Sequence, residues 1–210
     1  MTTEAIGGRR KAVWGAAMAL GVAVSALSLA ACGDMVLEGD TSSYLIIQNL
    51  DGSSGATPDE FGNPIMSDVL TNQSIFNDIG RVQMRLAMKD PGTAGSPTAP
   101  TPNNWITVTQ YRVRFIRADG RNTEGVDVPY GFDGTMAATL TDLNQTVTIS
   151  FELVRYTAKV EAPLKGLRGS QIIINAIAEI TFYGRDQTGR ETSVMGRVSI
   201  NFGDFADPAS

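Results

Sequence analysis

The chain has 210 residues, a formal net charge of −5 and no histidine. The lack of histidine excludes Ser-His-Asp and Cys-His catalysis and histidine-ligated metal sites. The acidic balance argues against nucleic acid as a partner, because affinity for phosphate backbones depends on clustered Lys and Arg. With a single cysteine, Cys32, no disulfide can form within the chain, so burial of apolar side chains must supply the stability.

The first 31 residues have the three-part layout of an export signal. The basic cluster Arg9-Arg10-Lys11 comes first, no charged residue follows until Asp34, and small residues precede the cysteine in Leu29-Ala30-Ala31-Cys32. An apolar run of about 20 residues also suffices to span a bilayer. The alternatives are therefore a cleaved signal and an uncleaved N-terminal anchor helix, with the cysteine either modified or a free thiol.

The motif at residues 29–32 resembles the lipobox of bacterial lipoproteins. The resemblance implies cleavage between Ala31 and Cys32, a diacylglyceryl group on the Cys32 sulfur and an acylated new amino end. Several acyl chains hold a protein firmly on a membrane, since each buried methylene contributes about 0.8 kcal/mol. Gly33 rather than Asp follows Cys32. In a Gram-negative envelope this favours the outer membrane, facing the periplasm or the surface, over the inner membrane.

We therefore expect a signal peptide at 1–31, a lipidated end and short spacer at 32–42, one domain at 43–205 and a tail at 206–210. Removal of the signal changes the net charge from −5 to −7, because it contains three basic residues and one acidic residue. The remaining chain is long enough for one domain with a substantial core. Apart from the covalent lipid, no cofactor is predicted.

Past the spacer, apolar and polar residues alternate, which predicts half-buried β-strands. The clearest runs are 81–89, 146–153 and 194–202. The alternation slips between Val108 and Tyr111, which predicts a β-bulge near Thr109-Gln110.

A second slip, between Leu153 and Val154, favours a stretch at 147–160 that bends and serves two sheets. Residues 171–183 are apolar on both faces and predict a central strand, with a short helix as the alternative. Elsewhere, helix is expected only as a turn or two around 66–70 or 74–79.

Between the last two strands, residues 185–190 have Asp and Gly placed for a tight hairpin. Residues 178–202 together resemble the closing hairpin of bacterial immunoglobulin-like domains. The predicted fold class is all-β: an antiparallel β-sandwich of the immunoglobulin-like type, with long loops and an N-terminal signal helix.

Two loops interrupt the strands. Residues 91–104 contain four prolines and predict an exposed loop; Trp105 at its end is either a binding aromatic or a packing residue. The second loop, 118–134, contributes Asp119, Asp127 and Asp133, and an earlier acidic group contains Asp51, Asp59 and Glu60. Calcium favours such oxygens, but the spacing is not that of an EF-hand. We interpret these acids as solvated turn residues and predict no metal site.

Arginines recur on alternating positions of two predicted strands, with Arg81 and Arg85 on one and Arg112 and Arg114 on the other. If these strands pair, the four guanidinium groups share one outer face of an acidic protein. Such a face either contacts an acidic partner or is solvated and balanced by local acids.

The function predicted from these features is that of a membrane-anchored cell-envelope lipoprotein with a non-catalytic protein-binding or structural domain. A sheet face or an open edge at 44–48 would contact an envelope protein. The alternative is a carbohydrate or small-ligand site with Trp105, Tyr130 and Phe132 as stacking surfaces. No enzyme is predicted, because no pair of carboxylates is singled out by its spacing. Oligomeric state is not indicated.

Overall fold

The computed structural model describes residues 41–205 and residue 207. The predicted signal peptide, its cleavage site, Cys32 and most of the spacer therefore lie outside the described residues, as does nearly all of the tail. Within the described part of the chain, no helix is both long enough and apolar enough to cross a bilayer.

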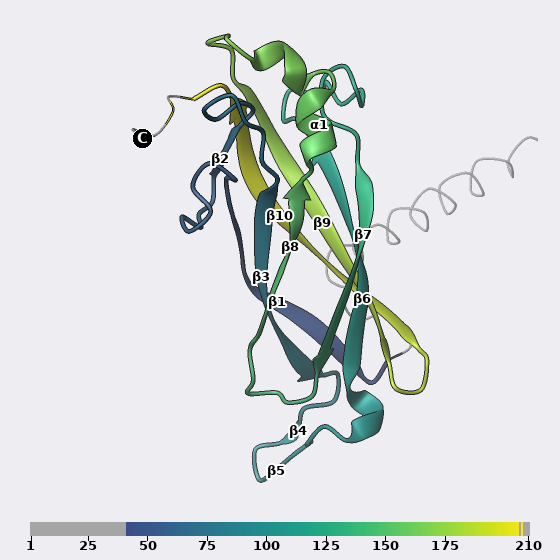
Figure 1. The fold of residues 1–210 in the computed structure, drawn as a ribbon. Helices are drawn as coiled ribbons and strands as arrows, with labels where there is room; N and C mark the ends of the chain where they lie inside the picture. The colour runs from purple at the N-terminus through teal and green to yellow at the C-terminus, as the bar shows by residue number, and fades with distance from the viewer. Residues whose placement is uncertain (1–40, 206, 208–210) are drawn as a thin grey trace, which may run out of the picture. The chain divides into compact units, whose positions relative to one another are not determined.

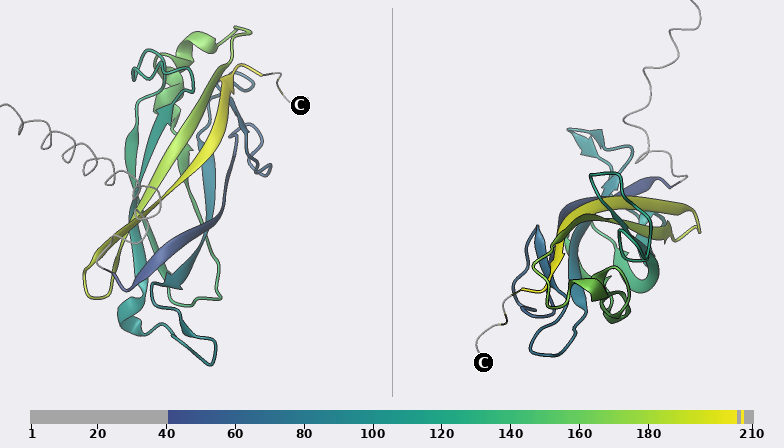
Figure 2. Two further views of the ribbon diagram at one scale, coloured as in Figure 1. Left: turned by 180° about the vertical axis from the view of Figure 1, so that it is seen from behind. Right: turned by 90° about the horizontal axis from the view of Figure 1, so that it is seen from above.

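The described chain is a β-sandwich, as predicted (Figures 1 and 2). One sheet has the order β1-β3-β8 and the other the order β2-β10-β9-β6-β7, and β4 and β5 form a separate small ribbon. All paired strands are antiparallel except β2 and β10, which run parallel. The strands are β1 (Ser43–Ser53), β2 (Ile65–Asp68), β3 (Asp78–Met88), β4 (Gly92–Thr93), β5 (Ser96–Pro97), β6 (Ile106–Ile116), β7 (Phe132–Leu140), β8 (Val147–Val154), β9 (Ile174–Asp186) and β10 (Glu191–Gly203).

The core lies between the two sheets, where every second side chain of the long strands points inward. An aromatic group joins the sheets: the Phe151 ring lies 5.1 Å from that of Tyr111 and 5.4 Å from that of Phe182, between ring centroids. Phe151 comes from the three-stranded sheet and the other two rings from the five-stranded sheet. Fully buried residues of the core include Val82, Met84, Leu86, Ile106, Val113, Ile180, Ile200 and Phe202.

The predicted bulge at Thr109-Gln110 is confirmed. Val108 pairs with Gly184 of β9 and Gln110 with Tyr183, so Thr109 is the extra residue. As a result Val108 and Tyr111 both face the core although three positions separate them.

Two further bulges occur in the three-stranded sheet. One lies at Leu153, because Asp78 pairs with Val154 while Ile79 pairs with Glu152. The slip predicted there is real, but the expectation that the stretch serves two sheets is wrong. Strand β8 pairs only with β3 and ends at Val154, and helix α1 (Tyr156–Val160) follows. The other bulge, at Gln48 of β1, was not anticipated from the sequence.

The end of the domain follows the prediction closely. Strand β9 is central, between β10 and β6, and a hairpin joins it to β10. Its turn closes through the Asp186 carboxylate, which accepts hydrogen bonds from the backbone N–H groups of Thr188 and Arg190. Gly189 has a φ of +89°, a conformation that glycine adopts without strain.

The short helices do not lie where they were expected. Residues 66–68 belong to strand β2, and residues 78–79 begin β3. Helical turns instead form at η2 (Pro102–Asn104), α1 and η3 (Leu164–Leu167). The expectation failed because short apolar runs do not distinguish a helical turn from a strand.

The two ends of the sandwich contain different elements (Figure 1). At one end the Ser43 hydroxyl at the start of β1 donates to the Asn104 carbonyl in η2, 2.5 Å away, so the described chain begins beside the 91–104 loop. Helix α1 and the 118–131 loop lie at the other end, after β8 and β6 have crossed the length of the domain. Strand β1 is an edge strand of its sheet.

Candidate functional site

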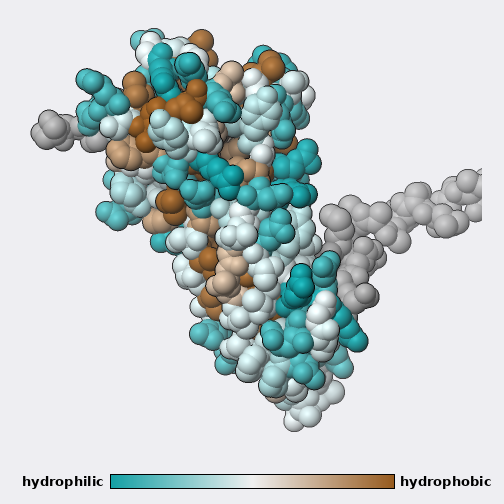
Figure 3. Space-filling model, turned by 45° about the vertical axis from the view of Figure 1, so that its right-hand side comes forward, coloured by the Kyte–Doolittle hydropathy of each residue, from teal (hydrophilic) through white to brown (hydrophobic). Residues whose placement is uncertain are grey.

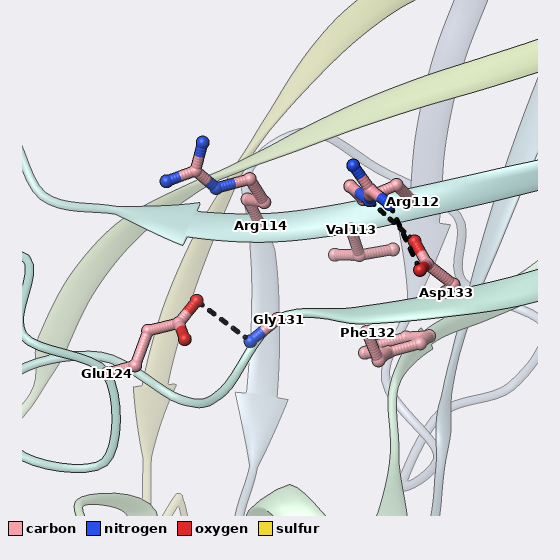
Figure 4. A pocket seen from close by; sticks show the side chains of 7 residues that line it. All are labelled: Arg112, Val113, Arg114, Glu124, Gly131, Phe132 and Asp133. Carbon is pink, nitrogen blue, oxygen red and sulfur yellow. Dashed lines mark hydrogen bonds and ion pairs between the residues drawn. The ribbon is translucent and has the colours of Figure 1, made fainter.

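A polar pocket of about 310 Å³ lies where β6 ends and β7 begins. Its lining residues are Arg112, Val113, Arg114, Glu124, Gly131, Phe132 and Asp133. Arg112 and Arg114 alternate with the buried residues Tyr111, Val113 and Phe115, so both point to the outer face of the five-stranded sheet (Figure 4).

Arg112 is already paired within the protein. Its Nε lies 2.6 Å from Oδ1 of Asp133 on the neighbouring strand, and its Nη2 lies 3.2 Å from Oδ2. The hydrogen bond from Arg112 lowers the pKa of the Asp133 carboxyl below its ordinary value. This pair forms one wall of the pocket and leaves it little net charge.

Arg114 has a different environment. On the β9 side of β6, Arg114 pairs in register with Glu179. The Glu179 carboxylate accepts two hydrogen bonds from Arg197, at 2.7 and 2.9 Å. Toward the pocket, Cγ of Arg114 lies 3.6 Å from the position that a Cβ on Gly131 would take. Because Arg112 and Glu179 have their own partners, Arg114 is the cationic group best placed to meet an incoming anion.

The other side of the pocket depends on Gly131. Its backbone N–H donates to Oε1 of Glu124 at 3.2 Å (Figure 4). A Cβ at position 131 would lie 2.9 Å from the Val113 carbonyl oxygen and 3.2 Å from the Glu124 carboxylate, so a larger residue would displace one of them. Sequence reasoning missed Glu124 and Gly131, since both lie in an irregular loop whose path follows from contacts with β6.

The four arginines singled out in the sequence do not share a face. Arg81 and Arg85 lie on β3, in the three-stranded sheet, whereas Arg112 and Arg114 lie on β6, in the five-stranded sheet. A shared face required these two strands to pair, and they do not. Alternation shows which side of a strand is polar but does not determine its neighbour.

The aromatic residues do not form the joint stacking surface predicted for carbohydrate binding. Trp105 precedes β6 and Phe132 pairs with Val113 near the end of β6, a separation of about 25 Å at roughly 3.3 Å per residue. The Phe132 ring is covered by the Arg155 guanidinium, 3.9 Å from its centroid. Tyr130 is 56 % exposed and adjoins the pocket through Gly131.

The predicted loop 118–134 ends earlier than expected, because β7 begins at Phe132, and Asp133 is therefore a strand residue rather than a turn residue. The acidic residues of this segment each have separate partners, which for Asp133 is Arg112. Asp119 pairs with Arg117 and Arg121, and Asp127 accepts a hydrogen bond from the Thr123 backbone N–H. Within residues 41–205 and 207, no three acidic, histidine or cysteine side chains gather in a way that could hold a metal ion.

The interpretation of Asp51 as a solvated turn residue is wrong. Asp51 lies within strand β1, is only 9 % exposed and forms an ion pair with Arg81.

Apolar surface on the face shown in Figure 3 lies in several separate patches with hydrophilic residues between them. The larger exposed apolar side chains are Met66, Phe76, Val126, Tyr130, Tyr156, Ile172, Ile173 and Met195. The arginine pocket, by contrast, brings two guanidinium groups and two carboxylates together on the outer surface. No protein family model, curated protein sequence or solved structure matches this chain.

Proposed function

We propose that this protein is a cell-envelope lipoprotein, anchored through a lipid on Cys32, whose sandwich is a non-catalytic binding module. The observation that carries the proposal is the position of the arginine pocket relative to the start of the domain. The described chain begins beside η2, and the pocket lies at the opposite end of β6.

This arrangement suits a binding site that must extend away from a membrane. Strand β6 has 11 residues, so it covers about 35 Å at roughly 3.3 Å per residue. The nine Cα-to-Cα steps from Cys32 to Thr41 reach at most about 30 Å when extended. A lipid on Cys32 would hold the η2 end toward the bilayer and present the pocket to an envelope partner.

The strand order supports an immunoglobulin-like assignment. The order β1-β3-β8 in one sheet and β10-β9-β6-β7 in the other agrees with the A-B-E and G-F-C-C′ orders of variable-type immunoglobulin sandwiches. In variable immunoglobulin domains, loops at one end of the sandwich make the binding contacts.

The ligand chemistry that fits the pocket is a carboxylate on another protein. A guanidinium binds a carboxylate through two parallel hydrogen bonds, and Arg114 is placed to do so. Glu124 and Asp133 at the rim disfavour a multiply charged anion. The lipid anchor is proposed to lie in the outer membrane, and a single acidic envelope protein is the proposed partner of the pocket.

The anchor is tested by intact mass. Protein extracted in detergent should begin at Cys32 and be heavier by a diacylglyceryl group and one fatty acyl chain, and the Cys32→Ala variant should lack both. A chain that keeps residues 1–31 and has no lipid would overturn the anchored-lipoprotein proposal.

The pocket is tested by photo-crosslinking in cells, with benzoylphenylalanine replacing the exposed Tyr130. We expect a crosslinked partner that is lost with Arg114→Glu and kept with Arg185→Glu, a matched charge reversal in β9 at the far end of the sheet. The same probe at Trp105 should not capture that partner. Equal capture with Arg114→Glu would exclude the pocket as the contact site.

A further inference from the structure

Lys159 is a lysine with no exposure to solvent, in the last turn of helix α1. Its Nζ lies 2.6 Å from Oδ1 of Asp78, the first residue of β3, and donates to the Asp68 carbonyl oxygen at 2.8 Å. Burial of an uncompensated ammonium is very costly, so this contact must be maintained by the surrounding fold. The pair lies apart from the arginine pocket and has no role in the function proposed above.

Asp78 is equally buried, and two donors hold its carboxyl group in one orientation. The Ser67 hydroxyl donates to Oδ2 at 2.5 Å and the Gly55 backbone N–H donates to Oδ1 at 2.9 Å. Burial raises the pKa of the Asp78 carboxyl, although Lys159 acts in the opposite direction. Transfer of one proton from the ammonium to the carboxylate removes two buried charges and produces a neutral amine beside a neutral acid.

An amine and a carboxylic acid are the two reactants of an amide bond, and here they are held in contact with neither side chain exposed to solvent. Well-oriented groups within one molecule react with effective molarities of about 10⁵ to 10⁸ M. Donors such as Ser67 and Gly55, directed at the carboxyl oxygens, stabilise the negative charge that develops there during attack. Exclusion of bulk water also disfavours the reverse hydrolysis.

We propose that Lys159 and Asp78 condense into an intramolecular amide bond. Nζ of Lys159 attacks Cγ of Asp78, an N–C bond forms, and one Cγ–O bond breaks. The departing carboxyl oxygen leaves as water with two of the three ammonium protons, and the third stays on the amide nitrogen. No oxidant, metal or nucleotide is consumed.

The bond would join α1 to the start of β3 across 81 positions of the chain. A covalent loop of this size restricts the unfolded chain, as a disulfide does. The chain has no pair of cysteines with which to form such a link, and an amide, unlike a disulfide, is insensitive to reductants.

A digest of the purified full-length protein, denatured and cut after Lys, Arg and Glu, tests the proposal. Cleavage at Glu60 and Arg81 releases peptide 61–81, and cleavage at Arg155 and Glu161 releases peptide 156–161. Both lie far from Cys32, so lipidation does not complicate the masses. Trypsin does not cut after an amidated lysine, so we expect one branched peptide, lighter by one water molecule than the sum of 61–81 and 156–161.

Fragmentation of the branched peptide assigns the bond, because Asp68 is the only other carboxylate side chain in 61–81. The Lys159→Met variant keeps an apolar stem, lacks the amine and should give free 61–81. If that variant fails to fold, the digest of the wild type still shows whether the amide bond is present. Free 61–81 with cleavage after Lys159 in the wild type, or a bond to Asp68, would overturn the proposal.

Discussion

Arg81 on β3 and Asp51 on β1 face each other across the strand pair and form a two-pronged ion pair. Nε of Arg81 lies 3.0 Å from Oδ1 of Asp51, and Nη2 lies 2.7 Å from Oδ2. The guanidinium carbon also lies 3.9 Å from the centroid of the Phe61 ring. Arg81 therefore connects the edge strand β1 with the loop that follows it.

This pair predicts a pH dependence of stability. The hydrogen bond from Arg81 lowers the pKa of Asp51 below its ordinary value of 3.8. Ionised Asp51 therefore stabilises the fold above that value, and the stabilisation is lost as the pH falls through the lowered pKa. Urea unfolding at several pH values should show that Asp51→Asn is less stable than the wild type at pH 7 and that the difference shrinks in acid. The same change at exposed Asp59 controls for the loss of one charge, and a pH-independent difference would contradict the prediction.

Gly80 is expected to be intolerant of any side chain. It pairs with Phe151 across β3 and β8, and a Cβ there would lie 2.4 Å from the nearest atom of the Phe151 ring. Gly80→Ala must push this ring away from Tyr111 and Phe182, at a cost of about 1–3 kcal/mol in the free energy of unfolding. Gly166→Ala is the control, because a Cβ at that position meets open space. Equal unfolding midpoints for the two variants would show that the ring relaxes freely.

The Asp186 carboxylate should account for much of the stability of the β9–β10 turn. Asp186 is 4 % exposed, and its Oδ1 accepts from the Thr188 N–H at 2.8 Å, the Thr188 hydroxyl at 2.7 Å and the Arg190 N–H at 3.0 Å. Asp186→Ala leaves these donors without their acceptor and should cost about 1–3 kcal/mol. Asp186→Asn keeps one acceptor oxygen and should cost less. Denaturant unfolding measures the stability of both variants. An Asn variant as unstable as the Ala variant would show that the acceptor oxygen is not what stabilises the turn.

Asp119 should stay ionised at a more acidic pH than an ordinary aspartate. Hydrogen bonds from Arg117, the larger cause, and from Arg121 hold the pKa of its carboxyl well below the ordinary 3.8. In a carbon-detected NMR titration, Arg117→Ala should move this pKa back toward 3.8, and Arg121→Ala should move it less. A pKa unchanged by Arg117→Ala would show that the pair does not persist in solution.

Much of the fold follows from the alternation of apolar and polar residues, which is a local property. The inward faces of β3, β8 and β10, the bulge in β6 and the final hairpin were all predicted from residues close together in the chain. Sheet membership is not local. Nothing in the runs around Arg81 and Arg112 shows that β1, rather than β6, is the neighbour of β3.

The buried lysine illustrates the same limit. Around Lys159 the sequence has no apolar run that would indicate a core position, and lysine is almost never fully buried unless it is paired. Its partner, Asp78, lies 81 positions earlier in the chain. The pocket residues Glu124 and Gly131 were missed for a related reason, since a loop path depends on the strands that it crosses.

The extra residue in β6 has a consequence for which changes in chain length the domain can accept. Removal of Thr109 alone would restore a regular strand against β9 and leave Tyr111, Val113 and Phe115 facing inward. Removal of one residue further along, such as Arg112, would instead reverse the facing of every later position in the strand. Among single deletions in β6, we therefore expect the loss of Thr109 to be the best tolerated.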